Sequence, residues 1–315
     1  MAARGKEMHF DIILNPAGAS GKTEKLWGKY ERLFKKSGNE YTLHKSTKEK
    51  WIGDIVRELT SSGAEIRLVV IGGDGTLNEA LGGIADFEHT ALGFISCGTG
   101  NDMQRDMSLP KSKKALVKRM LDGEVKRTAD VGELTFFGEG DIIKRRFNIS
   151  SDIGFGAATC AYADKSPLKP ILNRLGLGRL IYLVEAAKVC FTAKPADIVI
   201  RYDGKGKRYR KALSAIAMNH CHEGGGFKFC PNADYDDGLL DVVVGTGLSK
   251  LSFLKMLPLA YKGKHTNVKG IHFHKARVVE MISDKPLWAH TDGEVLGQTR
   301  RVIMRITGEK LRLIV

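Results

Sequence analysis

The stretch that decides the fold reads RLVVIGGDGTLNE and covers residues 67–79. Its first part, Arg67–Ile71, has the composition of a strand buried within a sheet. The glycines that follow allow a tight turn and let phosphate oxygens come close to main-chain N–H groups. A helix predicted over Leu77–Ile84 would point its positive end toward the same turn. A strand, a glycine-rich turn and a helix in this order predict a phosphate-binding loop.

The surrounding sequence alternates strands and helices. Short apolar runs at Phe10–Leu14, Tyr41–His44 and Ala91–Ile95 predict three more strands. Apolar residues at helical spacing predict helices over Lys22–Lys36 and Lys48–Thr60. Strands separated by helices of this length indicate a parallel sheet that is covered on both faces. We therefore expect an α/β fold whose amino-terminal domain has three layers around a parallel sheet.

Two further loops follow equivalent strands. NPAGASGK at residues 15–22 follows the first strand, and GTGND at residues 98–102 follows the strand at 91–95. The carboxyl ends of parallel strands meet at one edge of a sheet, where ligands bind in open α/β folds. The first loop is not a Walker A motif, because that spacing would require glycine where Pro16 stands. Three such loops at one edge predict a nucleotide site.

The second half of the chain has a different pattern of predicted secondary structure. From residue 126 onward, short alternating segments dominate, and helical stretches occur near 180–189 and 252–261. This pattern predicts a strand-rich, mainly antiparallel domain, and we place the boundary near residue 125. The expected architecture is a nucleotide-binding domain over 1–125 followed by a β-sandwich domain over 126–307. The apolar segment 168–182 is expected to pack in a core, with a membrane-facing helix as the alternative.

Composition and charge narrow the class of partner. Among 315 residues, 50 are Lys or Arg and 36 are Asp or Glu, and the net charge of +14 indicates an anionic partner such as a nucleotide or an acidic membrane. Five cysteines without regular spacing indicate free thiols in a reducing, cytoplasmic compartment. No signal-peptide core or run of 18 apolar residues is present, so any contact with lipid is expected to be peripheral. No docking motif for nucleic acid is present, and we expect no nucleic-acid partner.

The motifs NPAGASGK, GGDGTLNEAL and GFISCGTGND, in this order, resemble the catalytic family of diacylglycerol kinases. That family includes soluble bacterial lipid kinases and the sphingosine and ceramide kinases. The second half fits as well, through GGGF at 224–227, PNADYDDGLLD at 231–241 and TDGE at 291–294. The resemblance implies transfer of the γ-phosphate of ATP to a lipid hydroxyl at a membrane surface, with diacylglycerol as the default acceptor. It also implies Mg²⁺, a homodimer, and a last strand near 308–315 that returns to the first domain.

The resemblance further implies roles for individual residues. Asp292 would take the proton of the lipid hydroxyl, with Glu294 as its helper or alternative. A structural Mg²⁺ would bind the side chains of Asp234 and Asp237 and the main-chain carbonyl of Leu239. Phosphoryl transfer also needs a positioned, charge-neutralised nucleotide. The nucleotide-binding residues would be Asn15, Pro16, Ala17, Gly18, Thr47, Gly72, Gly73, Asp74, Gly75, Thr76, Leu77, Asn78, Glu79 and Thr99.

Simpler interpretations stay open from the residues alone. Asp292-Gly293 also predicts a hairpin turn, the acidic turn 234–241 can be merely solvated, and Thr47 can cap a helix. His220, Cys221 and His222 have the wrong spacing for a zinc finger. The alternative function is a soluble-substrate kinase of the NAD kinase type, which shares the GGDGT loop, and a third candidate is a binding protein without catalysis. Asn78-Glu79 and the TDGE motif favour the lipid kinases.

Overall fold

The computed structural model describes residues 8–16, 18, 21, 23–97, 101–174 and 179–315. The chain divides into two compact units, Met1–Ala129 with Glu309–Val315, and Asp130–Gly308. The first unit extends a little beyond residue 125 because the main-chain N–H of Lys126 donates to the carbonyl of Leu313 at 2.8 Å. This bond ties the end of the first unit's main segment to the carboxyl-terminal strand.

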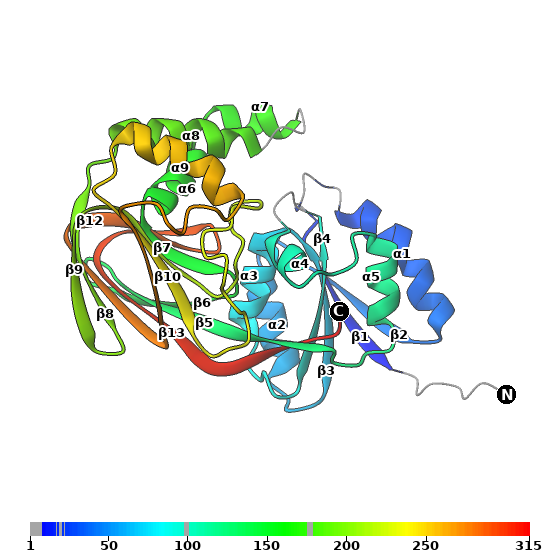
Figure 1. The fold of residues 1–315 in the computed structure, drawn as a ribbon. Helices are drawn as coiled ribbons and strands as arrows, with labels where there is room; N and C mark the ends of the chain where they lie inside the picture. The colour runs from blue at the N-terminus through cyan, green and yellow to red at the C-terminus, as the bar shows by residue number, and fades with distance from the viewer. Residues whose placement is uncertain (1–7, 17, 19–20, 22, 98–100, 175–178) are drawn as a thin grey trace. The chain divides into compact units, whose positions relative to one another are not determined.

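Parallel strands form the centre of the first unit (Figure 1). Strand β1 (His9–Leu14) pairs in parallel with β2 (Glu40–Lys45) and β3 (Ile66–Gly72), and β3 pairs in parallel with β4 (Thr90–Ser96). Residues 312–313 of β13 (Glu294–Leu313) add a further parallel pairing beside β4. Every residue of β4 is buried, as expected for a sheet that is covered on both faces.

Five helices of the described chain belong to this unit. The longest, α1 (Thr23–Ser37), buries Trp27, Tyr30 and Phe34, and the ring of Phe34 meets that of Phe10 on β1 at 5.5 Å between centroids. Aromatic pairs at this distance stabilise the contact of helix and sheet. The other four are α2 (Ile52–Thr60), α3 (Asp74–Gly83), α4 (Asp102–Asp106) and α5 (Lys113–Met120).

Two helices of the first unit begin several residues from their predicted starts. The helix predicted from Lys48 begins at Ile52, because the hydroxyl of Thr47 accepts the N–H groups of Glu49 and Lys50, at 3.2 and 3.1 Å, and closes a separate turn. Thr47 is therefore not the N-cap of α2, and that alternative was wrong. The helix predicted from Leu77 begins earlier, at Asp74, with Gly73 as its N-cap.

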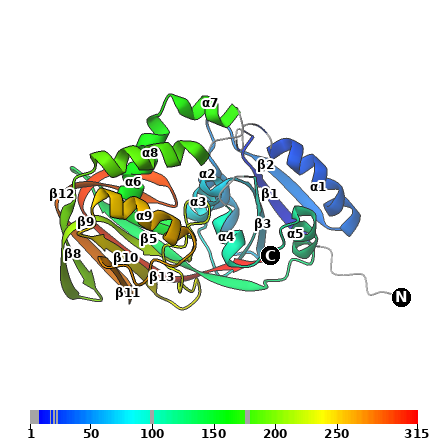
Figure 2. The same cartoon turned by 45° about the horizontal axis from the view of Figure 1, so that its top comes forward.

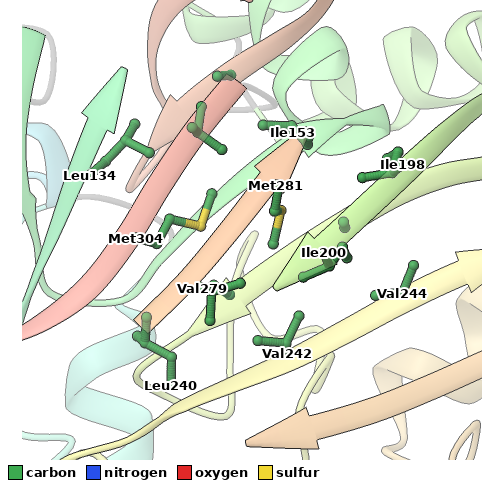
Figure 3. Packing of buried hydrophobic residues seen from close by; sticks show 14 of the residues in the cluster. Leu134, Ile153, Ile198, Ile200, Leu240, Val242, Val244, Val279, Met281 and Met304 are labelled. Carbon is green, nitrogen blue, oxygen red and sulfur yellow. The ribbon is translucent and has the colours of Figure 1, made fainter. Parts of the chain in front are cut away.

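Antiparallel strands make up most of the second unit. The sheet order is β11-β10-β9-β7-β12-β13, while β8 pairs with β9 and β12, and β5 pairs with β13 and β6. Side chains from these strands form one apolar core, part of which Figure 3 shows, including Ile153, Val242, Met281 and Met304. The strands are β5 (Arg127–Phe137), β6 (Ile142–Phe147), β7 (Ser150–Gly154), β8 (Ala196–Tyr202), β9 (Lys205–Met218), β10 (Leu240–Thr246), β11 (Ile271–Ala276) and β12 (Val278–Thr291).

Four helices lie together in the second unit, as Figures 1 and 2 both show. They are α6 (Phe155–Lys165), α7 (Leu168–Arg174), α8 (Arg179–Thr192) and α9 (Lys250–Tyr261). Phe155 on α6 and Phe253 on α9 meet at 4.5 Å between ring centroids, and Val189 on α8 joins the same cluster. A second, smaller core thus holds these helices to the sheet.

Most described apolar side chains of the segment 168–182 do not pack in a core as predicted. Its side chains Leu168, Ile171, Leu180 and Tyr182 are each more than two-fifths exposed, and Ile181 is buried. The expectation of core packing was therefore wrong, because α7 and α8 turn only one side toward α6 and α9. Among the described residues, no helix is long and apolar enough to span a membrane.

Candidate active site

The turn after β3 brings a helix amino terminus to the carboxyl end of the parallel sheet. Gly72 ends the strand, and the first helical hydrogen bond of α3 runs from the N–H of Leu77 to the carbonyl of Gly73 at 3.1 Å. A Cβ atom on Gly72 would lie 2.4 Å from the Cβ of Thr76, which explains why glycine stands there. A Cβ on Gly73 would meet nothing within 4 Å. The turn therefore offers open space beside the positive end of a helix.

The loops after β1 and β2 lie at the same edge of the sheet. Leu14 is paired with Lys45 on β2 and with Ile71 on β3, so the residues that follow all three strands leave the sheet together. The carbonyl of Asn15 accepts the N–H of Gly18 at 3.0 Å and the hydroxyl of Thr23 at 2.6 Å, which folds the first loop back on itself.

The predicted nucleotide residues differ in what they expose at this edge. Leu77 is 3% exposed and packs in the core, so only its main chain can contact a ligand. Thr76 and Asn78 are also buried, whereas Gly73, Asp74, Gly75 and Glu79 are partly exposed. Pro16 and Gly18 are partly exposed, while the predicted contacts Ala17 and Thr99 lie outside the described residues.

Asp292 is fixed by the main chain of the strand beside it. Its carboxylate accepts the N–H groups of Asn148, Ile149 and Ser150 at 2.9, 2.8 and 3.0 Å. Its own N–H donates to the carbonyl of Ser150 at 2.9 Å. Asp292 has φ 48° and Gly293 φ 87°, so the turn needs a left-handed backbone, which Asp and Gly tolerate best. The Asp-Gly signal for a turn between strands was correct, and the turn also holds a carboxylate in one orientation.

Glu294 begins the next strand, two residues after Asp292, and is held differently. The side chain is exposed, but neighbouring atoms partly desolvate its carboxyl and raise its pKa, and the nearby carboxylate of Asp164 raises it further. A carboxylate with a raised pKa is a better proton acceptor near neutral pH than one in open solvent. The two acidic residues of the turn therefore differ. Main-chain amides hold the Asp292 carboxylate in place, whereas the Glu294 carboxyl has a raised pKa and takes up a proton more readily.

Three further ionisable side chains, which no sequence motif identifies, lie behind this turn. His290 is 2% exposed, and its Nε2 atom lies 3.4 Å from Asp152 Oδ1 and 3.6 Å from Glu223 Oε1. Burial raises the pKa of Asp152 to about 7, against the main-chain N–H groups of Ala157 and Gly156, which lower it. The three residues lie far apart in the sequence and in no common motif, so nothing in the sequence groups them.

Asn219 links the strands that surround Asp292. Its amide donates to the carbonyls of Asp130 and Asn148, at 2.8 and 2.9 Å. The Asp130 carboxylate in turn accepts the N–H of Gly238 at 2.7 Å, which connects the acidic turn 234–241 to the same group. Hydrogen bonds from side chains to the main chain thus bring the motif residues of the second unit together.

Lys275 on β11 lies against the acidic turn, where the family resemblance implies a metal. Lys275 Nζ lies 2.8 Å from Asp237 Oδ2 and 3.1 Å from Asp241 Oδ2. The other oxygen of Asp237 accepts the N–H of Leu239 at 3.0 Å. Lys275 thus places one positive charge against two of the four aspartates of the turn, and the Mg²⁺ set of Asp234, Asp237 and the Leu239 carbonyl stays a prediction.

Comparison with known proteins shows two family matches that together cover almost the whole chain. Residues 9–134 match the model of the diacylglycerol kinase catalytic domain, and residues 153–315 match that of the YegS C-terminal NAD kinase beta sandwich-like domain. The chain is 25% identical over 290 residues to the diacylglycerol kinase of Bacillus subtilis, covering 91% of this chain and 89% of that protein. It is 26% identical over 290 residues to that of Staphylococcus saprophyticus, with the same coverage.

Solved structures share the fold at low sequence identity. A crystal structure of a diacylglycerol kinase from Bacillus anthracis superposes with a TM-score of 0.68 at 20% identity, covering 97% of this chain and 96% of that one. Yeast NADH kinase superposes with a TM-score of 0.52 at 9% identity, covering 98% of this chain and 83% of that one. The loops, the acidic turn and the TDGE turn stand where the two family models match. The chain therefore belongs to the lipid kinase family that joins a diacylglycerol kinase catalytic domain to a YegS-type carboxyl-terminal domain.

Proposed function

We propose that this ATP-dependent lipid kinase phosphorylates diacylglycerol at the cytoplasmic surface of a membrane, with Mg²⁺ accompanying the nucleotide. The observation that carries the proposal is the Asp292 carboxylate, held by three main-chain N–H groups inside a motif that matches the family. The oxygen of the lipid hydroxyl attacks the γ-phosphorus of ATP. The bond between that phosphorus and the oxygen that bridges it to the β-phosphate breaks, and ADP leaves. The hydroxyl proton passes to Asp292, with Glu294 as the second acceptor because its pKa is raised.

The nucleotide is proposed to bind at the loops of the first unit. The turn 72–75 offers main-chain N–H groups and the positive end of α3 to the phosphates, and the open space beside Gly73 leaves room for them. The loop that begins at Asn15, the Thr47 turn and residue Thr99 are proposed to contact the rest of the nucleotide. Mg²⁺ is proposed to arrive bound to ATP, and no step depends on a metal in the acidic turn.

The lipid is proposed to be reached through a helical face of the second unit. Ten large apolar side chains on α7, α8 and α9 are more than a third exposed: Leu168, Ile171, Leu180, Tyr182, Leu183, Val184, Phe191, Leu251, Leu259 and Tyr261. We call these residues the α7–α9 face. The helices that carry them lie side by side in both views (Figures 1 and 2). An apolar surface of this extent is typical of an interaction site.

Charge complementarity selects an anionic bilayer as the partner of this face. Residues 168–194 and 249–264 contain nine Lys or Arg and one acidic residue, Glu185. Glu185 is buried and paired with Lys188 at 2.8 Å, so it adds little negative charge to the surface. Exposed apolar side chains on helices rich in basic residues match the hydrocarbon boundary and the anionic headgroups of a membrane.

The deciding experiment is a transfer assay with radiolabelled ATP and Mg²⁺. Vesicles of phosphatidylglycerol that contain diacylglycerol supply the acceptor, and parallel reactions contain a sphingoid base or NAD. We expect labelled phosphatidic acid from diacylglycerol and no labelled NADP. Transfer to NAD alone would support the NAD kinase alternative, and ATP binding without transfer to any acceptor would support a non-catalytic binding protein.

A further inference from the structure

The buried group behind the Asp292 turn consists of His290 on β12, Asp152 on β7 and Glu223. His290 is 2% and Asp152 1% exposed, and Glu223 is partly buried. Burying ionisable groups together costs more free energy than burying apolar groups of the same size, unless their hydrogen bonds are satisfied. Packing alone gives no reason for three such groups here, and the transfer reaction as described does not use them.

The contacts of His290 fix its orientation and its tautomer. The N–H of Gly293 donates to His290 Nδ1 at 3.2 Å. A ring nitrogen that accepts a hydrogen bond carries no proton, so the neutral ring has its hydrogen on Nε2. That nitrogen faces Asp152 Oδ1 at 3.4 Å and Glu223 Oε1 at 3.6 Å. One side of the imidazole therefore holds the turn, and the other side faces two carboxyl groups.

Glu223 reaches the other side of the same turn. Its carboxylate accepts the hydroxyl of Ser150, whose main-chain N–H donates to the Asp292 carboxylate at 3.0 Å. Glu223 is therefore linked to the turn at two places. It accepts a hydrogen bond from Ser150, and it faces the His290 ring that binds Gly293. These two contacts limit the movement of Asp292 relative to the strand that binds it.

Asp152 anchors the group to the protein core. Its carboxylate accepts the N–H of Ala157 at 2.8 Å, at the beginning of α6. A Cβ atom on Gly156 would lie 2.2 Å from Asp152 Oδ2, so the chain leaves room for this carboxylate and for little else. The position of Asp152, and hence of the His290 ring against it, is determined by α6 and β7 together.

We propose that His290, held by Asp152 and Glu223, is a positioning residue that keeps the Asp292 carboxylate in its productive orientation. This inference rests on the proposed lipid kinase function. It assigns the buried group no contact with substrate or nucleotide. Misplacement of a catalytic group by about 1 Å can lower a rate by about 100-fold, so a support of this kind is felt in kcat rather than in binding.

The test compares four variants of the full-length protein in the diacylglycerol assay. His290→Gln retains a donor toward the carboxylates but loses the acceptor for Gly293. His290→Asn retains that acceptor but cannot reach the carboxylates, and His290→Leu loses both contacts. The matched control is His265→Leu, because His265 is also 1% exposed in the same unit and contacts the carbonyl of Phe229 instead.

The expected result is a separation of kcat from KM. We expect kcat to fall at least tenfold in His290→Leu and less in His290→Gln and His290→Asn, while the KM for ATP stays within twofold. His265→Leu should retain wild-type kcat if it folds, and thermal unfolding of each variant checks that condition. Wild-type kcat in a folded His290→Leu protein would overturn the inference, as would a fall in kcat no larger than that of His265→Leu. An inactive wild type would instead count against the proposed function.

Discussion

The main-chain N–H of Ile149 donates to the carboxylate of Asp292 at 2.8 Å, across 143 residues of sequence. Asn148 and Ser150 donate to the same carboxylate. Three amide donors leave this side chain little rotational freedom. These hydrogen bonds also give Asp292 a role in stability. Truncation of its side chain would leave buried N–H groups without an acceptor, at a cost of about 1–3 kcal/mol each.

Asp292→Asn should therefore separate catalysis from binding better than truncation to alanine. Asn keeps one acceptor oxygen for the N–H groups of Ile149 and Ser150 and tolerates the left-handed backbone of this turn. We expect lipid phosphorylation to fall by at least 100-fold, with the Kd for ATP unchanged within twofold. Isothermal titration and the radiolabel assay measure the two quantities. Near-normal transfer would move the role of base to Glu294, and Glu294→Gln is the companion variant.

The two glycines at the end of β3, Gly72 and Gly73, should affect different properties when substituted. Gly72→Ala places a methyl group 2.4 Å from the Cβ of Thr76, which cannot rotate away, and we expect a loss of about 1–3 kcal/mol in unfolding free energy. Gly73→Ala projects into open space, so the fold should tolerate it. If phosphate lies in that space, Gly73→Ala should weaken ATP binding at least tenfold without lowering Tm. Unchanged ATP affinity would contradict the proposed phosphate position.

Local features of this chain can be predicted from the sequence, whereas features that depend on strand pairing cannot. The unit formed by Arg67–Ile71 and α3 is contiguous, so its hydrophobic pattern and glycines identify it directly. The role of Asp152 depends on the antiparallel pairing of β7 with β12, which places Ser151 opposite Thr291. No periodicity in either segment specifies that register. Lys275 likewise reaches Asp241 only because β10 and β11 pair these two residues.

Membrane binding should depend on the α7–α9 face. Phe191 and Leu251 are 58% and 61% exposed, so changing both to serine should leave Tm unchanged. Full burial of each such side chain in lipid contributes about 1.5–3 kcal/mol, so we expect binding to phosphatidylglycerol vesicles to weaken at least tenfold. Ile142→Ser is the matched control, because Ile142 is 66% exposed on strand β6. Vesicle sedimentation measures the binding. An equal loss of vesicle binding in Ile142→Ser would show that the α7–α9 face is not the membrane-binding surface.

Stability should fall as pH rises, because of Asp152. Its pKa is raised from 3.8 to about 7 in the folded protein, so folding takes up a proton between these values. The stabilisation is complete below about pH 4 and is lost as pH rises through 7. At about 1.4 kcal/mol per pKa unit, unfolding free energy should fall by up to about 3 kcal/mol between pH 5 and pH 8.

Asp152→Asn isolates this effect from the other raised carboxyl groups. Asp241 and Glu294 have raised pKa values in the wild type and in the variant alike, so the difference between the two proteins reports Asp152. We expect urea unfolding of Asp152→Asn to vary less between pH 5 and pH 8 than that of the wild type. Equal slopes would show that the carboxyl is ionised in the folded protein at pH 5.

Magnesium should affect the stability of the acidic turn only after its lysine is removed. Lys275 lies against Asp237 and Asp241, and the buried Asp241 carboxyl has its pKa raised to about 6 even with the lysine present. Lys275→Met leaves these carboxylates without a cation and should lower unfolding free energy by about 1 kcal/mol, since the pair is partly exposed.

In nucleotide-free Lys275→Met, added Mg²⁺ should raise Tm by several degrees, because a hard cation can then bind the freed carboxylates. The wild type should show almost no difference between Mg²⁺ and EDTA. Adding Asp237→Asn to Lys275→Met should abolish the response, which identifies Asp237 as a ligand. A fall in wild-type Tm on treatment with EDTA would mean that Mg²⁺ binds the turn alongside the lysine, as the family resemblance implies.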